Sequence, residues 1–283
     1  MGPNLVEYLK YEAENTGIAW ITFNRPERRN ALMGNSQEKG TVAKVGEYMR
    51  AADDDPDVRV IVLTGEGQGF CSGADMRRDN DPSVLGENFI GNRDHTERPD
   101  LTRQHFFHGF TQLHRDISLI RKPTIAMING AAVGSGMDMA LHCDIRVGCE
   151  ATQFVGYHQL GQIFENGGSY YLPKMAGLGR ALEFAYTGRL DAERAYQWGI
   201  LNYLVDSSEL EQTTRDLSLL QELGLTLKLV VDTHAHADHV TAAWLLKQKT
   251  GCQIASAAVI NAEHVDLPLQ PGQRFGVSGI ELE

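Results

Sequence analysis

The sequence is poor in cysteine, in positive charge and in long apolar runs. Its four cysteines include no CxxC pair, so no disulfide framework is expected. The 26 Lys and Arg residues against 37 Asp and Glu give a formal net charge of -11, which argues against a nucleic-acid surface because binding phosphates needs a basic patch. No stretch approaches the ~20 apolar residues of a membrane helix, and residues 1–10 lack a secretory apolar run. We therefore expect a cytoplasmic protein with free thiols.

The first 205 residues alternate β-rich runs with helical stretches. A polar loop is expected over residues 77–100. The alternation predicts an α/β fold with strands packed under helices. Strands are predicted at 18–23, 58–63, 123–128 and 144–147, and helices at 37–52, 101–121 and from about 134 to 142.

Two glycine-rich turns follow β-rich runs. VRVIVL leads into GFCSGAD at 69–75, and PTIAMI leads into NGAAVGSGMDMALHCD at 129–144. Each turn places backbone N–H groups at the end of a strand, and the second opens a helix, whose first N–H groups are unsatisfied donors. Two such groups aimed at one point would stabilise the enolate oxygen of a thioester. Either turn alone is better explained as a structural turn, whereas the ordered pair is more specific.

Four ordered blocks resemble the enoyl-CoA hydratase/isomerase (crotonase) superfamily. The resemblance implies a crotonase-type ββα superhelix core over residues 1–207 that acts on acyl-CoA thioesters, with Ala74 and Ser135 as oxyanion donors. Coenzyme A enters as part of the substrate, no other cofactor is required, and a homotrimer or hexamer is expected from the family. The blocks are NRPERRNAL at 24–32, GFCSGADM at 69–76, KPTIAMINGAAVGSGMDMALHCDIR at 122–146 and LPKMAGLGRALEFAYTGRLDAERAYQWGILNYLV at 172–205.

The same resemblance implies a set of residues that hold the coenzyme A. Arg28 and Arg29 are the candidates for contact with its phosphates, and the alternative for both is a solvated surface pair. The residues implied in binding are Arg28, Ala31, Ser72, Asp75, Met76 and Gly134.

Acid–base chemistry next to a thioester needs a positioned carboxylate. Family hydratases carry a glutamate where this chain has Asp138 and a second where it has Tyr157, so the usual two-glutamate hydration is in doubt. Dienoyl-CoA isomerases and 4-chlorobenzoyl-CoA dehalogenase, which FVGYHQLGQIFEN also resembles, place a working carboxylate at Glu165. We predict Asp138 and Glu165 as the paired carboxylates, with Tyr157 lining the pocket.

Other roles stay open for these carboxylates. Asp138 is also explained as an acid favoured by the dipole of its own helix, and Glu165 as a surface loop carboxylate. The leading function is an acyl-CoA hydratase or isomerase that proceeds through an enolate. The alternative on the same fold is an acyl-CoA hydrolase or dehalogenase with Glu165 as nucleophile or base.

The composition changes after residue 205. A helix capped at 206–208 is expected to run to about 223, and a strand at 226–232 leads into the motif HAHADH. Clustered imidazole and carboxylate groups suit zinc or iron. The candidate ligands are His234, His236, Asp238 and His239.

The HAHADH segment resembles the metallo-β-lactamase superfamily, and within it the persulfide dioxygenase branch. The resemblance implies a partial metallo-β-lactamase-like αβ segment over residues 208–283. In that branch only His234 of the motif would bind the iron, and one ligand does not hold a catalytic metal, so we expect no working Fe or Zn site. A metal-dependent sulfur dioxygenase or hydrolase is the second class of function, and an inactive chimera the third.

Overall fold

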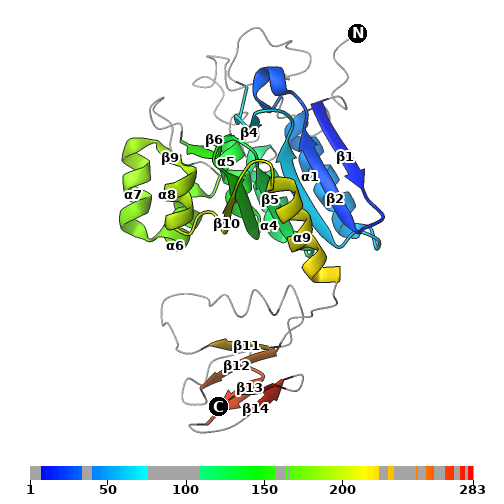
Figure 1. Ribbon diagram of the computed structural model, residues 1–283, viewed down its shortest axis with the longest axis vertical. Helices are drawn as coiled ribbons and strands as arrows, with labels where there is room; N and C mark the ends of the chain where they lie inside the picture. Colours follow the sequence, from blue (N-terminus) through cyan, green and yellow to red (C-terminus); the bar gives the residue numbers. More distant parts are fainter. Residues whose placement is uncertain are drawn as a thin grey trace, which may run out of the picture. The chain divides into compact units, whose positions relative to one another are not determined.

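The chain forms two compact units, Met1–Ser218 and Leu219–Glu283, which are described separately. The computed structural model (Figure 1) describes residues 8–33, 40–75, 109–156, 164, 166–222, 229–232, 247, 253–257, 265–270, 275–277 and 280–282.

A six-stranded sheet forms the centre of the first unit. Its order is β1-β2-β3-β5-β7-β10, parallel from β2 onward, with β1 antiparallel to β2. Every residue of β3 is buried, as expected for a parallel strand covered on both faces. The four predicted strands are confirmed to within two residues at each end. The strands are β1 (Leu9–Ala13), β2 (Ile18–Phe23), β3 (Val60–Gly65), β5 (Thr124–Ile128), β7 (Ile145–Cys149) and β10 (Tyr203–Val205).

A second sheet has four strands of three residues each, in the order β4-β6-β8-β9. The chain passes from β3 to β4, from β5 to β6 and from β7 to β8, so the turns of a ββα superhelix repeat along the chain. The sequence predicted turns at 69–75 and 129–134 and missed β4 and β6, because three residues are too few to show an alternating pattern. The strands are β4 (Gly69–Cys71), β6 (Ala131–Val133), β8 (Gln153–Val155) and β9 (Arg189–Asp191).

Helices cover the core of the first unit. The helices α1 and α4 pack against one another, and α5 packs between α4 and α6. The predicted helices are found, although α1 begins four residues later than expected and residues 101–108 lie outside the described residues. The helices are α1 (Thr41–Asp54), α4 (Phe110–Leu119), α5 (Ser135–His142), α6 (Gly168–Ala176), α7 (Leu178–Thr187), α8 (Ala192–Gln197) and α9 (Leu210–Glu222), with a short 3-10 helix at Pro26–Arg28.

Helix α9 covers the other face of the central sheet. Leu210 is buried in one cluster with Ile18 and Trp20. Arg215 donates to both carboxylate oxygens of Glu14 at 2.8 and 3.0 Å, and its guanidinium lies over the Trp20 ring at 4.9 Å. The first unit, which ends at Ser218, therefore includes the greater part of α9.

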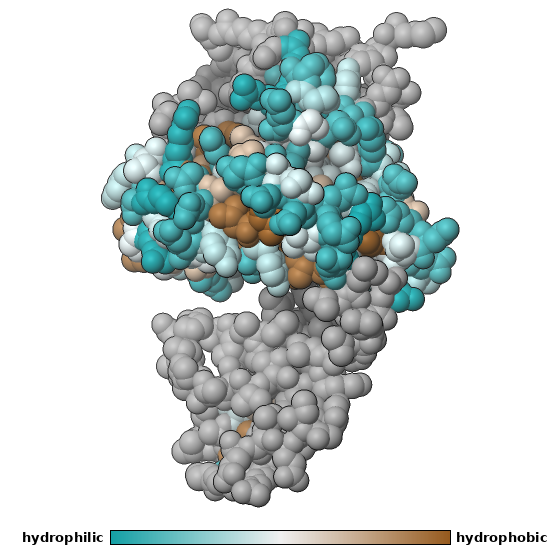
Figure 2. All heavy atoms as spheres, in the orientation of Figure 1, coloured by the Kyte–Doolittle hydropathy of each residue, from teal (hydrophilic) through white to brown (hydrophobic). Residues whose placement is uncertain are grey.

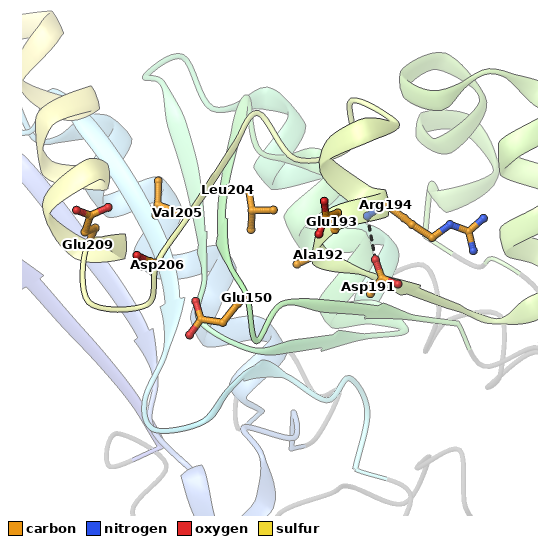
Figure 3. A pocket seen from close by; sticks show the side chains of 9 residues that line it. All are labelled: Glu150, Asp191, Ala192, Glu193, Arg194, Leu204, Val205, Asp206 and Glu209. Carbon is orange, nitrogen blue, oxygen red and sulfur yellow. Dashed lines mark hydrogen bonds between the residues drawn. The ribbon is translucent and has the colours of Figure 1, made fainter.

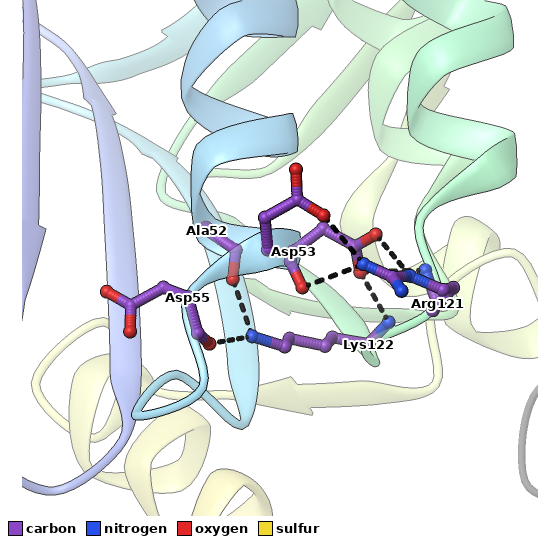
Figure 4. Close-up of polar contacts among 6 residues, drawn as sticks. Ala52, Asp53, Asp55, Arg121 and Lys122 are labelled. Atoms are coloured by element: carbon purple, nitrogen blue, oxygen red, sulfur yellow. Dashed lines mark hydrogen bonds and ion pairs between the residues drawn. The ribbon is translucent and has the colours of Figure 1, made fainter.

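A group of hydrogen bonds and ion pairs connects the end of α1 to the turn before β5 (Figure 4). Arg121 donates to Asp53 through Nε at 2.8 Å and through its backbone N–H at 2.9 Å. Lys122 donates to the carbonyls of Ala52, at 2.7 Å, and of Asp55. Burial raises the pKa of Asp53, but the hydrogen bonds from Arg121 and Lys122 outweigh it and hold that pKa below its ordinary value.

The face of the first unit seen in Figure 2 is mainly hydrophilic where it is described, with separate apolar patches. None of the helices in the described part of the chain is long and apolar enough to span a membrane. Cys71, Cys143 and Cys149 are buried, and none of them forms a disulfide within the described residues.

The second unit contains a small parallel sheet in the order β11-β12-β13 and a separate hairpin of β14 and β15. The predicted strand at 226–232 is found as β11. Asp266 accepts from the backbone N–H of Ile254 at 2.8 Å and pairs with Lys247 at 2.6 Å. The strands are β11 (Leu229–Asp232), β12 (Gln253–Ala257), β13 (Leu267–Leu269), β14 (Phe275–Val277) and β15 (Ile280–Leu282).

Candidate active site

The NRPERRNAL block is tied to the turn between β3 and β4 by Asn30. Its side chain accepts from the backbone N–H of Arg25 at 2.8 Å and donates to the carbonyls of Glu66 and Gly69 at 3.0 and 2.7 Å. Asn30 has a φ of 58°, in the left-handed region that asparagine enters more readily than most residues. The block therefore lies beside the first glycine turn.

The first glycine turn is held in place by backbone pairing. Leu32 donates to the Gly73 carbonyl at 2.8 Å, and Asp75 donates to the Leu32 carbonyl at 3.0 Å. This forms a parallel bridge between Leu32 and Ala74, in which the N–H of Ala74 itself points away from Leu32. Gly73 has a φ of 76°, which favours glycine. The Ala74 N–H has no acceptor among the described residues.

A buried ion pair braces this turn. Arg25 Nη1 lies 2.6 Å from Asp75 Oδ2, with side chains only 8% and 4% exposed. The sequence analysis missed Arg25, since nothing in the two blocks indicated that these opposite charges meet. Because the Asp75 carboxylate pairs with Arg25, Asp75 contributes to a ligand site by holding the turn in shape.

The second glycine turn ends β6 and starts α5. Gly134 has φ 52° and ψ −120°, a conformation for glycine only. Ser135 is the first helical residue, so its N–H has no acceptor within the helix, and it has none elsewhere among the described residues. Its side chain is 7% exposed, and its buried Oγ has no hydrogen-bond partner there either. Ser135 thus offers a free backbone donor at a helix N-terminus.

The two glycine turns lie in contact. A Cβ added to Gly136 would lie 2.3 Å from the Cys71 carbonyl oxygen, and one added to Gly130 would lie 2.2 Å from that of Gln68. Only glycine permits this approach, which places the turn after β4 next to the start of α5. Cys71 is not a nucleophile here, because burial raises the pKa of its thiol to about 12.

Asp138 lies in the first turn of α5 and is 3% exposed. The N-terminus of α6 approaches it closely, since a Cβ added to Gly168 would lie 2.8 Å from Asp138 Oδ1. Two helix N-termini therefore lie near one carboxylate, and both favour its negative charge. This arrangement is compatible with both predicted roles of Asp138, the catalytic one and the structural one.

The remaining predicted site residues divide into two groups. Arg28 and Ser72 lie together, because Ser72 donates through Oγ to the Arg28 carbonyl at 3.4 Å and through its N–H to the Arg29 carbonyl at 3.0 Å. Arg28 and Ala31 are half-buried, whereas Arg29 is exposed. Several predictions fall outside the described residues: Met76, Tyr157, Glu165, His234, His236, Asp238, His239 and the loop at 77–100. Within the described residues no group of three or more His, Cys, Asp or Glu could hold a metal ion.

A pocket of about 810 Å³ lies elsewhere in the first unit (Figure 3). Its acidic lining does not suit an anionic coenzyme A, and Asp191 is already occupied in capping α8 through the Arg194 N–H at 2.9 Å. None of the predicted site residues lines it. The lining residues are Glu150, Asp191, Ala192, Glu193, Arg194, Leu204, Val205, Asp206 and Glu209.

Known proteins resemble most of this chain in sequence. The sequence model of the enoyl-CoA hydratase/isomerase family matches residues 13–240. The chain belongs to this family. The resemblance predicted from the four sequence blocks and the crotonase-type fold are both confirmed.

Members of the enoyl-CoA hydratase/isomerase family with different activities are similar to this chain. The 1,2-epoxyphenylacetyl-CoA isomerase of Escherichia coli K12 is 32% identical over 219 residues, 76% of each chain. The 4-chlorobenzoyl coenzyme A dehalogenase-1 of an Arthrobacter species is 30% identical over 71% of this chain and 68% of the relative. The crystal structure of a monofunctional enoyl-CoA isomerase of M. smegmatis superimposes with a TM-score of 0.58 at 26% identity, covering 76% of this chain and 85% of the other.

The C-terminal segment has a second similarity. The model of the metallo-β-lactamase superfamily matches residues 201–281, which confirms the predicted metallo-β-lactamase-like segment. The two matches overlap over 201–240 and so do not place the boundary between the segments.

Proposed function

We propose that the first unit is an acyl-CoA hydratase or isomerase that works through a thioester enolate. The single observation that carries the proposal is the contact between the two glycine turns, each with one backbone N–H, of Ala74 and Ser135, that has no acceptor among the described residues. Two preorganised donors on one carbonyl oxygen stabilise the negative charge that develops as a proton leaves the neighbouring carbon.

In this proposal Asp138 and Glu165 move the protons. A carboxylate removes the proton beside the thioester and the second returns a proton at another position. Asp138 reaches the site from the first turn of α5, three residues after Ser135. Tyr157 lines the pocket.

The coenzyme A lies along the edge formed by the NRPERRNAL block and the first glycine turn. Arg28 and Arg29 supply positive charge for its phosphates, and Asp75 acts through its ion pair with Arg25. The proposed contacts are Arg28, Ala31, Ser72, Asp75, Met76 and Gly134.

The oxyanion role of Ser135 is testable because Ser135 is the first residue of α5, the helical position that accepts proline best. Ser135→Pro deletes the N–H, whereas the matched control Ser135→Ala keeps it. We expect kcat to fall about 100-fold or more in Ser135→Pro, as for loss of one oxyanion donor, and to change little in Ser135→Ala. If folded Ser135→Pro keeps the kcat of Ser135→Ala, the oxyanion hole is wrong.

The similarity to a dehalogenase favours a second candidate, an acyl-CoA hydrolase or dehalogenase with Glu165 as nucleophile or base. Enoyl-, dienoyl- and aroyl-CoA thioesters are assayed with the wild type, Asp138→Asn and Glu165→Gln. Loss in both variants on enoyl or dienoyl substrates supports the hydratase or isomerase. Loss in Glu165→Gln alone on aroyl substrates supports the second candidate, and no loss in either overturns both assignments.

The match to the metallo-β-lactamase superfamily favours a further class, a metal-dependent sulfur dioxygenase or hydrolase. Stoichiometric iron or zinc in the purified protein, lost in His234→Ala, would support it. No binding of any CoA thioester in calorimetry would instead support an inactive chimera. The proposed homotrimer or hexamer is tested by light scattering.

A further inference from the structure

Helix α5 presents a polar face that the enolate chemistry uses only in part. Ser135, Asp138 and His142 are spaced i, i+3 and i+7, so they lie on one side of the helix. Helices α4 and α6 pack against α5. From them His114 and Tyr171 contact the His142 ring edge-on, with ring centroids 4.9 and 4.6 Å away. His142 is therefore enclosed on both sides.

Hydrogen bonds fix the tautomers of both histidines. His142 Nδ1 lies 2.7 Å from the Asp138 carbonyl oxygen, and His114 Nδ1 lies 2.6 Å from that of Phe110. A carbonyl oxygen only accepts hydrogen bonds, so each ring carries its proton on Nδ1. The Nε2 of His114 is buried with no partner of normal geometry in the described part of the chain.

Both rings are neutral at neutral pH. Burial lowers the pKa of His114 to about 3, with the nearby His142 adding to the effect, and burial also lowers the pKa of His142. His114 is thus a poor proton carrier for the reaction, since an efficient general base has a pKa near the working pH. The contacts of the pair indicate a different role.

The pair is linked to the candidate site through His142. Its Nδ1–H donates to the carbonyl of Asp138, and its ring contacts that of His114 at a centroid distance of 4.9 Å. Gly167 leaves room for the His142 ring, because a Cβ added to Gly167 would lie 2.7 Å from Cε1 of His142. An eight-residue helix is marginal alone and depends on such tertiary contacts.

We propose that His114 and His142 are positioning residues, a neutral imidazole pair that fixes the backbone of α5 so that the Ser135 N–H and the Asp138 carboxylate keep their alignment. This inference rests on the proposed function of the first unit. A side chain of similar volume without the Nδ1 donor would leave the fold in place but loosen the two catalytic groups.

The kinetic test compares two substitutions of His142. His142→Phe keeps the ring volume and removes the donor, whereas His142→Asn places an amide N–H where Nδ1 was. We expect His142→Phe to lose about 10- to 100-fold in kcat with KM little changed, because small misplacement of reacting groups costs rate. His142→Asn restores most of the kcat, and the control Tyr170→Phe, on the exposed neighbour of Tyr171, equals the wild type. Wild-type kcat in His142→Phe, or equal loss in both His142 variants, overturns the proposal.

A second measurement does not depend on activity. Imidazole ¹⁵N spectra of the full chain, assigned with His114→Asn and His142→Asn, report the tautomer of each ring. We expect the neutral Nδ1–H form for both, and the Nε2–H form in either ring overturns the positioning proposal. If the expected tautomers accompany a wild type that turns over no CoA thioester, the proposed function fails, and with it the catalytic consequence drawn here.

Discussion

The two units of this chain differ in the elements that accompany their parallel sheets. In the first unit, α1 and α4 contribute to the core on one face of the six-stranded sheet, and α9 covers the other face. In the second unit, the described residues give a three-stranded parallel sheet and a hairpin. A parallel sheet is stable when both of its faces are covered. The described contacts therefore bring the two glycine turns of the first unit together, whereas the HAHADH motif of the second unit lies outside the described residues.

The first unit depends on contacts between segments that are distant in the sequence, and substitutions at these contacts measure that dependence.

The largest effect is expected from Gly136→Ala. The added Cβ would lie 2.3 Å from the Cys71 carbonyl oxygen, so β4 and α5 have to move apart and the two N–H donors separate. We expect a loss of kcat/KM of about 100-fold or more together with a lower unfolding midpoint. Gly179→Ala is the matched control, since nothing lies within 4 Å of its added Cβ. It is helical and should be neutral or more stable by up to about 1 kcal/mol.

The second effect concerns the buried pair of Arg25 and Asp75. Asp75→Ala removes the buried partner of the Arg25 charge and leaves only the exposed Glu27, 3.8 Å from Nε, which should lower the free energy of unfolding by about 3–5 kcal/mol in urea titrations. The exposed control Arg50→Ala, which breaks a pair with Asp116, should cost at most about 1 kcal/mol. Equal costs for the two variants would contradict the role given to this pair.

The third effect is a pH dependence at Asp53. Its pKa is lowered in the folded state, so its contribution to stability is complete above the ordinary carboxylate value and is lost as the pH falls through the folded value. Asp53→Asn should therefore be less stable than the wild type at pH 7, by about 1 kcal/mol, and the gap should narrow toward pH 3. Urea unfolding at both pH values measures it, and a gap that widens in acid would reverse the assignment.

The smallest effect is expected from metal removal. The proposed enolate chemistry uses backbone donors and carboxylates, so EDTA treatment and His234→Ala should leave the turnover of CoA thioesters unchanged. Metal content by mass spectrometry is measured on the same samples. If the activity falls on chelation and returns with iron or zinc, the function would have to be assigned to the second unit.

The sequence indicates the long strands better than it indicates the short strands and the contacts between distant segments. VRVIVL and PTIAMI are apolar runs with clear ends, so β3 and β5 were predicted closely. The strands β4 and β6 were missed because each has only three residues. The glycine turns pointed to Ala74 and Ser135, and the structure places their segments side by side. The Arg25–Asp75 pair and the His114–His142 contact join distant segments, and no local sequence pattern indicates such contacts.

The packing of α9 decides where this chain can be divided. A fragment ending at residue 207 would lack Leu210, which covers Trp20, and Arg215, which pairs with Glu14. It would expose the apolar cluster that Leu210 helps to bury and would be prone to aggregate. A fragment that keeps these contacts has to extend at least through Arg215, inside the stretch that also matches the metallo-β-lactamase superfamily. For domain exchange or recombination, the match to the metallo-β-lactamase superfamily begins at residue 201, whereas the contacts of the first unit continue to Arg215.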